Sequence, residues 1–308
     1  MKRVSISLLA LAVTSIAASA SALASYSTGF ETDQTSSFTI GATTADTVSN
    51  FSFDYSTYVP TAPTAGITTI PVAPSAAGTK ALKLAANVDA TGTTEAISAF
   101  VNAGTGISRY TLQFDCFQMW NGDAVGGGTG TTQSMVCGDA ATTAVAWQNS
   151  ANFSGEFFTI THECGSGTDL RYYEGNGTAA AAANNALPNW FGTNATANTA
   201  TEWVALFPTP TYSIAGAPGR VWNTWQMTVD GSLITIKVKP NGAASFTQVS
   251  AFSASAAASL AGNPFVGAQD TFASIADPAV DNFVLIDNLS FNELAAPTSA
   301  DSSWSAYN

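Results

Sequence analysis

The chain has 308 residues, of which 46% are hydrophobic and only 10% are charged, and its net charge is −12. Such an acidic surface repels phosphate backbones, which excludes nucleic-acid binding from the expected functions. Sparse charge together with abundant Ala, Thr, Ser and Gly is more typical of an extracellular protein than of a cytosolic enzyme.

The first 24 residues predict a bacterial-type secretory signal peptide. Lys2 and Arg3 form its positive start, residues 6–16 its apolar stretch, and residues 22–24 (ALA) its small-x-small cleavage motif. The apolar stretch is shorter than the ~20 residues that span a bilayer. We therefore expect export to the extracellular space, the periplasm or the cell surface, with no membrane span and a mature chain that begins at Ser25.

Residues 25–294 predict one all-β domain, and residues 295–308 a polar C-terminal tail. Period-two alternation recurs at residues 81–88, 110–120 and 225–239, as expected of strands with one face on a core. Trp225 falls on the apolar face of its strand and is predicted to be a core residue.

Two hairpins follow from the turn residues. Asp230-Gly231 lies between alternating runs, which is a strong local signal for a hairpin. Residues 157–160 and 170–173 are expected to pair across the turn at residues 165–167. Two Ala-rich stretches, Ala179 to Leu187 and Ser253 to Leu260, predict short peripheral helices.

Three cysteines remain in the mature chain: Cys116, Cys137 and Cys164. In an exported protein they predict either one disulfide, with three pairings open, or buried thiols.

Three short motifs mark the beginning, middle and end of the mature chain: STGFE at residues 27–31, WNTWQMTVDG at 222–231 and FVLIDNLSF at 283–291. Together they resemble the bacterial secreted members of the concanavalin A-like lectin/glucanase (laminin-G-like) superfamily. The resemblance implies an antiparallel, two-sheet jelly-roll β-sandwich. It does not imply one activity, because this architecture carries lectins, hydrolases, lyases and scaffolds.

Asp287 interrupts the apolar row that Phe283, Leu285, Leu289 and Phe291 are expected to form. A buried carboxylate needs hydrogen bonds, a cation or a bulge that turns it outward. The resemblance implies that the first and last strands lie side by side and share a structural calcium ion, which would be bound by Glu31 and Asp287 with loop carbonyls. The alternative is that Asp287 accepts hydrogen bonds from backbone amides at a bulge.

Catalytic residues are not evident. The glucanases of this superfamily carry Glu-x-Asp-x-x-Glu on one strand, and this spacing is missing. His162 is the only histidine in the sequence, which makes it a candidate acid–base residue. It shares a strand face with Phe158 and Ile160, however, which favours a core position. A lyase that uses Arg171, Tyr172 or Tyr173 with His162 has no motif to support it.

Sugar sites combine flat aromatic rings with amides and carboxylates. Candidate ligand-binding residues are Trp190, Trp203 and Trp222, together with Asn189 and Glu202. The alternative is that two of these tryptophans cap the ends of the core.

The sequence thus favours a secreted, non-catalytic protein that binds a polysaccharide or other glycan, or recognises a cell surface. One rival is a polysaccharide-cleaving lyase or glycoside hydrolase on the same fold. A self-assembling structural surface protein is the other. The oligomeric state is left open by the sequence.

Overall fold

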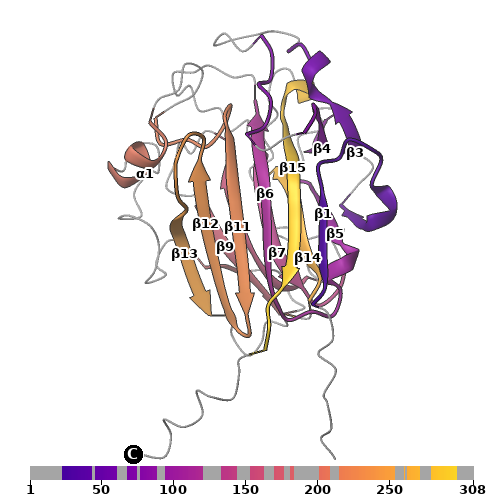
Figure 1. The fold of residues 1–308 in the computed structure, drawn as a ribbon, viewed down its shortest axis with the longest axis vertical. Coiled ribbons are helices and arrows are strands. Elements are labelled where there is room, and N and C mark those ends of the chain that lie inside the picture. Colours follow the sequence, from indigo (N-terminus) through magenta and orange to yellow (C-terminus); the bar gives the residue numbers. More distant parts are fainter. Residues whose placement is uncertain are drawn as a thin grey trace, which may run out of the picture.

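The fold is a sandwich of two antiparallel β-sheets, as the alternating pattern predicts. Figure 1 shows the sheets lying one in front of the other. A computed structural model provides the coordinates, and it describes residues 23–43, 46–60, 68–74, 77–88, 94–120, 133–143, 153–162, 170–176, 181–183, 201–208, 215–253, 260, 262–270 and 279–296.

The first sheet holds both the first and the last strand. Its order is β13-β12-β11-β6-β15-β4-β3, and β1 also pairs with β15. The strands are β1 (Ser25–Thr28), β3 (Thr47–Asp54), β4 (Lys80–Ala86), β6 (Arg109–Met119), β11 (Trp222–Asp230), β12 (Leu233–Pro240), β13 (Thr247–Ser253) and β15 (Phe283–Glu293).

The second sheet has the order β10-β9-β8-β7-β14-β5-β2. Its strands are β2 (Phe38–Ala42), β5 (Ala96–Val101), β7 (Gln133–Ala140), β8 (Ser154–Thr161), β9 (Leu170–Asn176), β10 (Ala181–Ala183) and β14 (Pro264–Asp270). One short α-helix, α1 (Thr201–Leu206), lies beside β12 and β13 in Figure 1.

The main core fills the space between the sheets. Alternate residues of the strands meet there, among them Phe114, Phe158 and Trp225, all 1% exposed or less. Burial of such large apolar side chains is the dominant stabilising contribution to a fold of this kind. A smaller apolar cluster, which includes Tyr55 and Trp222, covers part of the outer face of the first sheet.

Both predicted hairpins are confirmed. β11 and β12 pair from Asp230 and Leu233 onward, and Gly231 in the turn has a φ of +64°, a conformation that glycine adopts without strain. β8 and β9 pair as predicted, with Phe157 opposite Tyr173 and Ile160 opposite Leu170, whereas the turn predicted at residues 165–167 lies outside the described residues.

The two helix predictions are not matched in the described residues. Ala181–Ala183 forms the edge strand β10 against β9, because pairing at a sheet edge overrides the high helix propensity of alanine. Ser253 ends β13, and residues 254–259 lie outside the described part of the chain. In the described part of the chain, the α-helix α1 forms at Thr201–Leu206, which is outside both predicted stretches.

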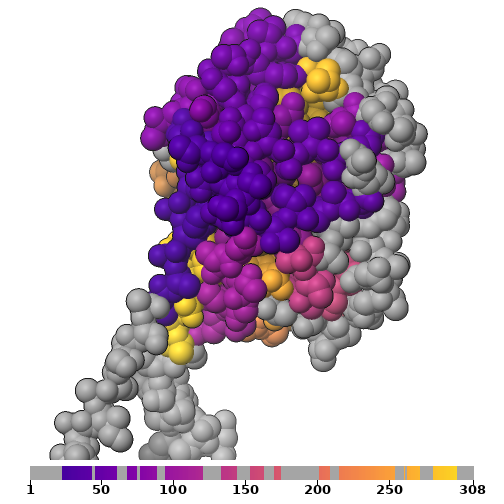
Figure 2. Space-filling view, turned by 90° about the vertical axis from the view of Figure 1, so that its right-hand side faces the viewer, coloured from indigo at the N-terminus to yellow at the C-terminus, as the bar shows by residue number. Residues whose placement is uncertain are grey.

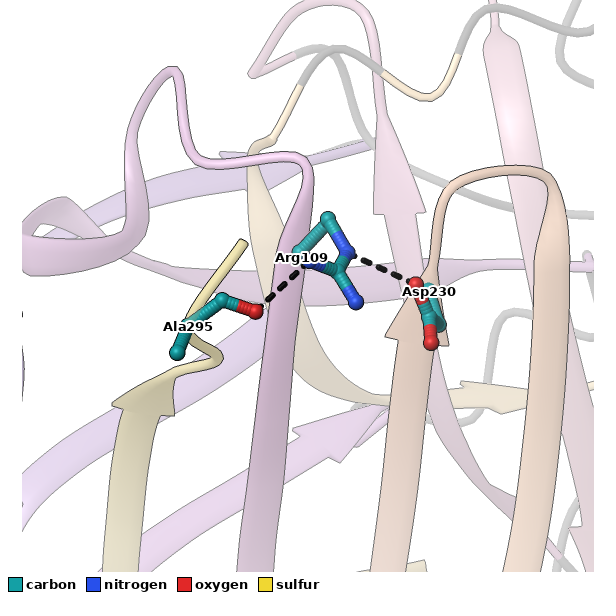
Figure 3. A network of polar contacts seen from close by, with 3 residues as sticks. All are labelled: Arg109, Asp230 and Ala295. Atoms are coloured by element: carbon teal, nitrogen blue, oxygen red, sulfur yellow. Dashed lines mark hydrogen bonds and ion pairs between the residues drawn. The ribbon is translucent and has the colours of Figure 1, made fainter. Parts of the chain in front are cut away.

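Polar contacts tie strand ends together at the edge of the domain. Arg109 donates from Nε to Asp230 Oδ1 at 2.7 Å and from Nη1 to the carbonyl oxygen of Ala295 at 2.6 Å (Figure 3). The N-terminal strands, indigo in Figure 2, form much of the side of the molecule that faces the viewer there, which is the right-hand side in Figure 1. Within the described residues, no helix is long and apolar enough to cross a membrane.

Cys116 and Cys137 are buried free thiols, on β6 and β7 respectively. Burial raises the pKa of both, that of Cys137 to about 12, so neither is a reactive thiolate at neutral pH. Cys164 lies outside the described residues.

Candidate functional site

β15 changes its neighbour halfway along one edge. β4 pairs with Val284 to Ile286, and β1 pairs with Leu289 to Asn292. The register between β15 and β6 shifts between Asp287 and Ser290, and Asn288 has a φ of +46°, which marks a β-bulge. The first and last strands therefore lie side by side, as expected, and the bulge lies where β4 gives way to β1.

The bulge corrects one expectation about β15. Phe283 and Leu285 belong to the outer cluster, whereas Leu289 and Phe291 point into the main core. The four side chains do not share one face, because the extra residue at the bulge reverses the alternation. By this alternation Asp287 lies on the outer side of the sheet with Phe283 and Leu285, yet it is fully buried.

Two buried carboxylates face one another across β6 and β15. Asp115 is the cross-strand partner of Asp287, and both are 1% exposed or less. Asp115 accepts hydrogen bonds from Thr224 Oγ1 at 2.6 Å and from Asn288 Nδ2 at 2.9 Å. Asp287 Oδ1 accepts the N–H of Asn288 at 2.7 Å, and an interaction with the Tyr55 hydroxyl also favours the charged carboxylate, whereas Oδ2 accepts no hydrogen bond within the described residues. Asp287 is thus the less compensated of the pair.

The electrostatic environment of Asp287 disfavours its charged form. Burial, together with the negative charges of Asp115 and Glu31, raises the pKa of Asp287 to about 7, although the hydrogen bond from the Asn288 N–H and the interaction with the Tyr55 hydroxyl lower it. Tyr55 lies in the same surroundings, and burial raises its pKa to about 12, with further contributions from Asp287 and Glu31. The structure therefore brings Glu31 and Asp287 into one electrostatic neighbourhood.

Glu31 follows β1 and bridges to the start of β4. The backbone N–H of Lys80 donates to Glu31 Oε1 at 3.1 Å, and Lys80 Nζ donates to the Glu31 carbonyl oxygen at 3.3 Å. A Cβ atom at Gly78 would lie 2.2 Å from Glu31 Cδ, so any other residue there would force the Glu31 carboxylate to move. Glu31 is thereby held at the junction where β1 and β4 both border β15.

The oxygen atoms at this junction are suitable ligands for a hard cation. Carboxylate and amide oxygens from Glu31, Asp287 and Asn288 are the ligands that Ca²⁺ prefers, and the unpartnered Asp287 Oδ2 is a free acceptor. Within the described residues, no group of three or more His, Cys, Asp or Glu side chains is close enough to hold a metal ion. Backbone and amide oxygens would therefore have to complete the shell.

The predicted ligand-binding residues are not gathered on an exposed surface. Trp203 lies in α1, stacked on Phe207 at 5.8 Å between ring centroids, and is 3% exposed. Trp222 is 1% exposed, and its Nε1 donates to the Pro71 carbonyl oxygen at 2.6 Å. Burial leaves neither ring face open to a sugar, so the alternative of core-capping tryptophans describes both. Glu202 is half-buried in α1, while Asn189 and Trp190 lie outside the described residues.

A cavity of about 310 Å³ is lined by residues that lie close to Trp203 and Trp222 in the sequence. Its walls come from the end of α1 and the segment after it, and from the adjoining ends of β11 and β12. The side chains that line it include Leu206, Phe207, Pro208, Val221 and Pro240, together with the amides Asn223 and Asn241.

His162 follows β8 and is fully buried, as its shared face with Phe158 and Ile160 predicts. Burial, together with the charge of nearby Arg220, lowers the pKa of His162 to about 3, although a hydrogen bond with the backbone of Met119 raises it. The guanidinium of Arg220 stacks over the Trp120 ring at 4.0 Å, and Arg220 has a φ of +61°. The imidazole is therefore neutral at neutral pH and poorly placed for proton transfer with a solvent-borne substrate.

The sequence did not reveal that Asp115 lies opposite Asp287, nor did it reveal the cavity. Alternation along residues 110–116 places Asp115 on the outward face with Gln113, but it does not reveal which residue lies opposite. The strand partner is 172 residues away in the chain, so only the order of strands in the sheet brings the two carboxylates together.

No protein-family model and no curated protein matches the chain in sequence. Among solved structures it is similar to the Ca²⁺/Man-bound VIP36 exoplasmic/lumenal domain (TM-score 0.48, 8% identity, 90% of this chain and 94% of that chain). It is also similar to peanut lectin with a 9mer peptide (0.44, 8%, 90% and 100%) and to lectin II from Ulex europaeus (0.43, 8%, 87% and 97%). These lectins share the concanavalin A-like jelly-roll fold that the sequence motifs resemble. Because these TM-scores are below 0.5, we infer neither ligand nor activity from them.

Proposed function

We propose that this protein is an exported, non-catalytic glycan-binding protein whose first and last strands are held together by a calcium ion. The observation that carries the proposal is the oxygen-rich junction of β1, β4 and β15. There the fully buried Asp287 faces Asp115, with Glu31 nearby. Uncompensated buried carboxylates are costly, and a cation bound by Glu31 and Asp287 would offset their repulsion.

Two features favour binding over cleavage. The sequence lacks the Glu-x-Asp-x-x-Glu spacing, so the carboxylate arrangement of the related glucanases is not available. His162 is fully buried and its pKa is lowered to about 3, which makes it a weak base that a substrate does not reach. The signal peptide predicted at residues 1–24 supports the exported location.

Calcium is expected to raise the thermal stability of the protein. A ligand that binds only the native state stabilises it by about 2.7 kcal/mol at a hundredfold excess over its dissociation constant. For a domain of this size we expect the melting temperature to rise by roughly 5–10 °C between EDTA and millimolar CaCl₂. Differential scanning calorimetry measures this shift.

Single substitutions of carboxylate residues test which of them bind the ion. Glu31→Gln and Asp287→Asn should each abolish the calcium response, whereas Asp33→Asn, an exposed neighbour of Glu31, should preserve it. Gly78→Ala should also reduce the response, because the new methyl group displaces the Glu31 carboxylate. An unchanged melting temperature after addition of calcium to the EDTA-treated wild type contradicts the metal site.

Glycan binding has its own test. A polysaccharide pull-down and a glycan array with the calcium-loaded protein should show retention on at least one glycan. Incubation with the same polysaccharides should release neither new reducing ends nor unsaturated products. Failure to bind any glycan on the array would overturn this part of the proposal, and product release would favour the enzymatic rival.

A further inference from the structure

The pairing of the first and last strands extends one residue ahead of β1. Ser25 lies opposite Asn292 in the register of β1 and β15, and one step further along this antiparallel ladder Ala24 lies opposite Glu293. The backbone N–H of Glu293 donates to the carbonyl oxygen of Ala24 at 2.9 Å, and the N–H of Ala24 donates to Glu293 Oε2 at 2.8 Å. The folded domain thus uses both hydrogen-bonding groups of the Ala24 backbone.

Ala24 also contributes to the main core. It is half-buried and packs against the apolar side chains between the sheets. Leu23, the residue before it, is 50% exposed. The folded domain therefore begins at Ala24, one residue before the start of the mature chain that the sequence predicts at Ser25.

A chain that began at Ser25 would lose these contacts without replacing them. In an antiparallel ladder, residues that exchange hydrogen bonds alternate with residues whose N–H and C=O groups point away from the neighbouring strand. Ala24 and Glu293 form a bonded pair, so the N–H of Ser25 points away from β15. A terminal ammonium group at Ser25 would therefore not occupy the position of the Ala24 N–H.

The sequence of the leader offers other cleavage sites. Residues 18–24 read ASASALA, so the Ala-x-Ala motif occurs at residues 18–20, 20–22 and 22–24. Cleavage after these motifs gives chains that begin at Ser21, Leu23 and Ser25 respectively. The first two chains keep Ala24. Of these, the chain that begins at Leu23 places its terminal ammonium group nearest to the carboxylate of Glu293.

We propose that the exported chain begins at Leu23, through hydrolysis of the Ala22–Leu23 peptide bond by a signal peptidase. Water adds across this amide, which leaves a carboxylate at Ala22 of the leader and an ammonium group at Leu23 of the mature chain. The positive charge lies one residue from the N–H that Glu293 already binds, and opposite charges attract at this range. The inference rests on the export proposed above, and it names the bond at which the leader is removed.

The test is N-terminal sequencing and intact mass of the protein exported by a bacterial host that makes the full-length chain. Two variants separate the candidate bonds, because the motif requires small residues at its first and third positions. Ala24→Gln removes the motif at residues 22–24 and keeps the one at 20–22. Ala20→Gln removes the motifs at residues 18–20 and 20–22 and keeps the one at 22–24.

We expect wild type and Ala24→Gln to begin at Leu23, and Ala20→Gln to lose processing at this bond. A wild-type chain that begins at Ser25 or Ser21, or an Ala24→Gln chain that keeps its leader while Ala20→Gln is processed normally, overturns the inference while export stands. If wild type keeps its leader and stays in the cell, the export itself fails, and this inference fails with it.

The contribution of Ala24 to the folded protein has a separate test. Chains that begin at Leu23 and at Ser25 are prepared by removal of a cleavable tag, and their melting temperatures are compared. We expect the Ser25 form to melt roughly 2–4 °C lower, the shift that loss of one ordinary hydrogen bond gives a domain of this size. Glu293→Ala should reduce this difference, because the acceptor of the Ala24 N–H is then absent. Equal melting temperatures of the two wild-type forms contradict the role of Ala24.

Discussion

Acidification from pH 7 to pH 4 is expected to destabilise the wild-type protein more than a His162→Gln variant. Burial, together with the charge of Arg220, lowers the pKa of His162 from 6.5 to about 3. Between these values the unfolded chain binds a proton that the folded protein does not. The stability associated with the neutral imidazole is therefore complete above pH 6.5 and is lost as the pH falls towards 3, by on the order of 5 kcal/mol over the whole window.

Urea unfolding at several pH values measures this effect. Carboxylates titrate in both proteins, so the difference between wild type and His162→Gln isolates the contribution of the imidazole. Wild type should show the steeper loss of unfolding free energy below pH 6.5. Parallel stability curves for the two proteins would contradict the buried, neutral imidazole.

Trp222→Ala is expected to cost about 3–5 kcal/mol of stability, the usual range for a buried tryptophan. The ring packs on Tyr55 and Phe117, each at 5.4 Å between centroids, and its Nε1 hydrogen bond holds Pro71. The substitution thus removes the contact between the outer face of the first sheet and the segment that covers it.

The measurement is the urea midpoint together with glycan binding. Leu233→Ala, at a position that is 45% exposed, should change stability by less than about 0.5 kcal/mol. Trp222→Phe keeps an aromatic ring but loses the hydrogen bond to Pro71, and should fall between wild type and Trp222→Ala. A stable Trp222→Ala variant that had lost only glycan binding would instead support the role in sugar recognition that sequence analysis considered.

Much of the candidate calcium junction was accessible from sequence, because Glu31 lies in the first of the three motifs, just after β1, and Asp287 lies in the last. Asp287 interrupts an apolar row, and that interruption alone required a bulge, a cation or a set of hydrogen bonds. The structure shows the bulge, at Asn288. It adds Asp115 and the space that Gly78 leaves for Glu31, neither of which alternation within a single strand reveals.

The tryptophans show the opposite case. Trp225 belongs to a regular alternating strand, and its place in the core followed from that pattern. Trp203 lies in a short helix, and Trp222 is the first residue of its strand. At such positions a local pattern does not distinguish a tryptophan that caps the core from one that is exposed to a ligand. Their burial depends on which distant residues pack over them, such as Tyr55, Ile70 and Ala73 over Trp222.

The sequence by itself determined the sandwich, its two hairpins and the assignment of Trp225 to the core, because the period-two alternation of a strand and the chemistry of a turn are local properties of the chain. Only the tertiary structure decided that Asp115 faces Asp287, that Ala181–Ala183 is an edge strand and that a cavity opens beside Asn223. Each of these depends on strand order, which joins segments that are far apart in the chain and whose pairing no local pattern specifies.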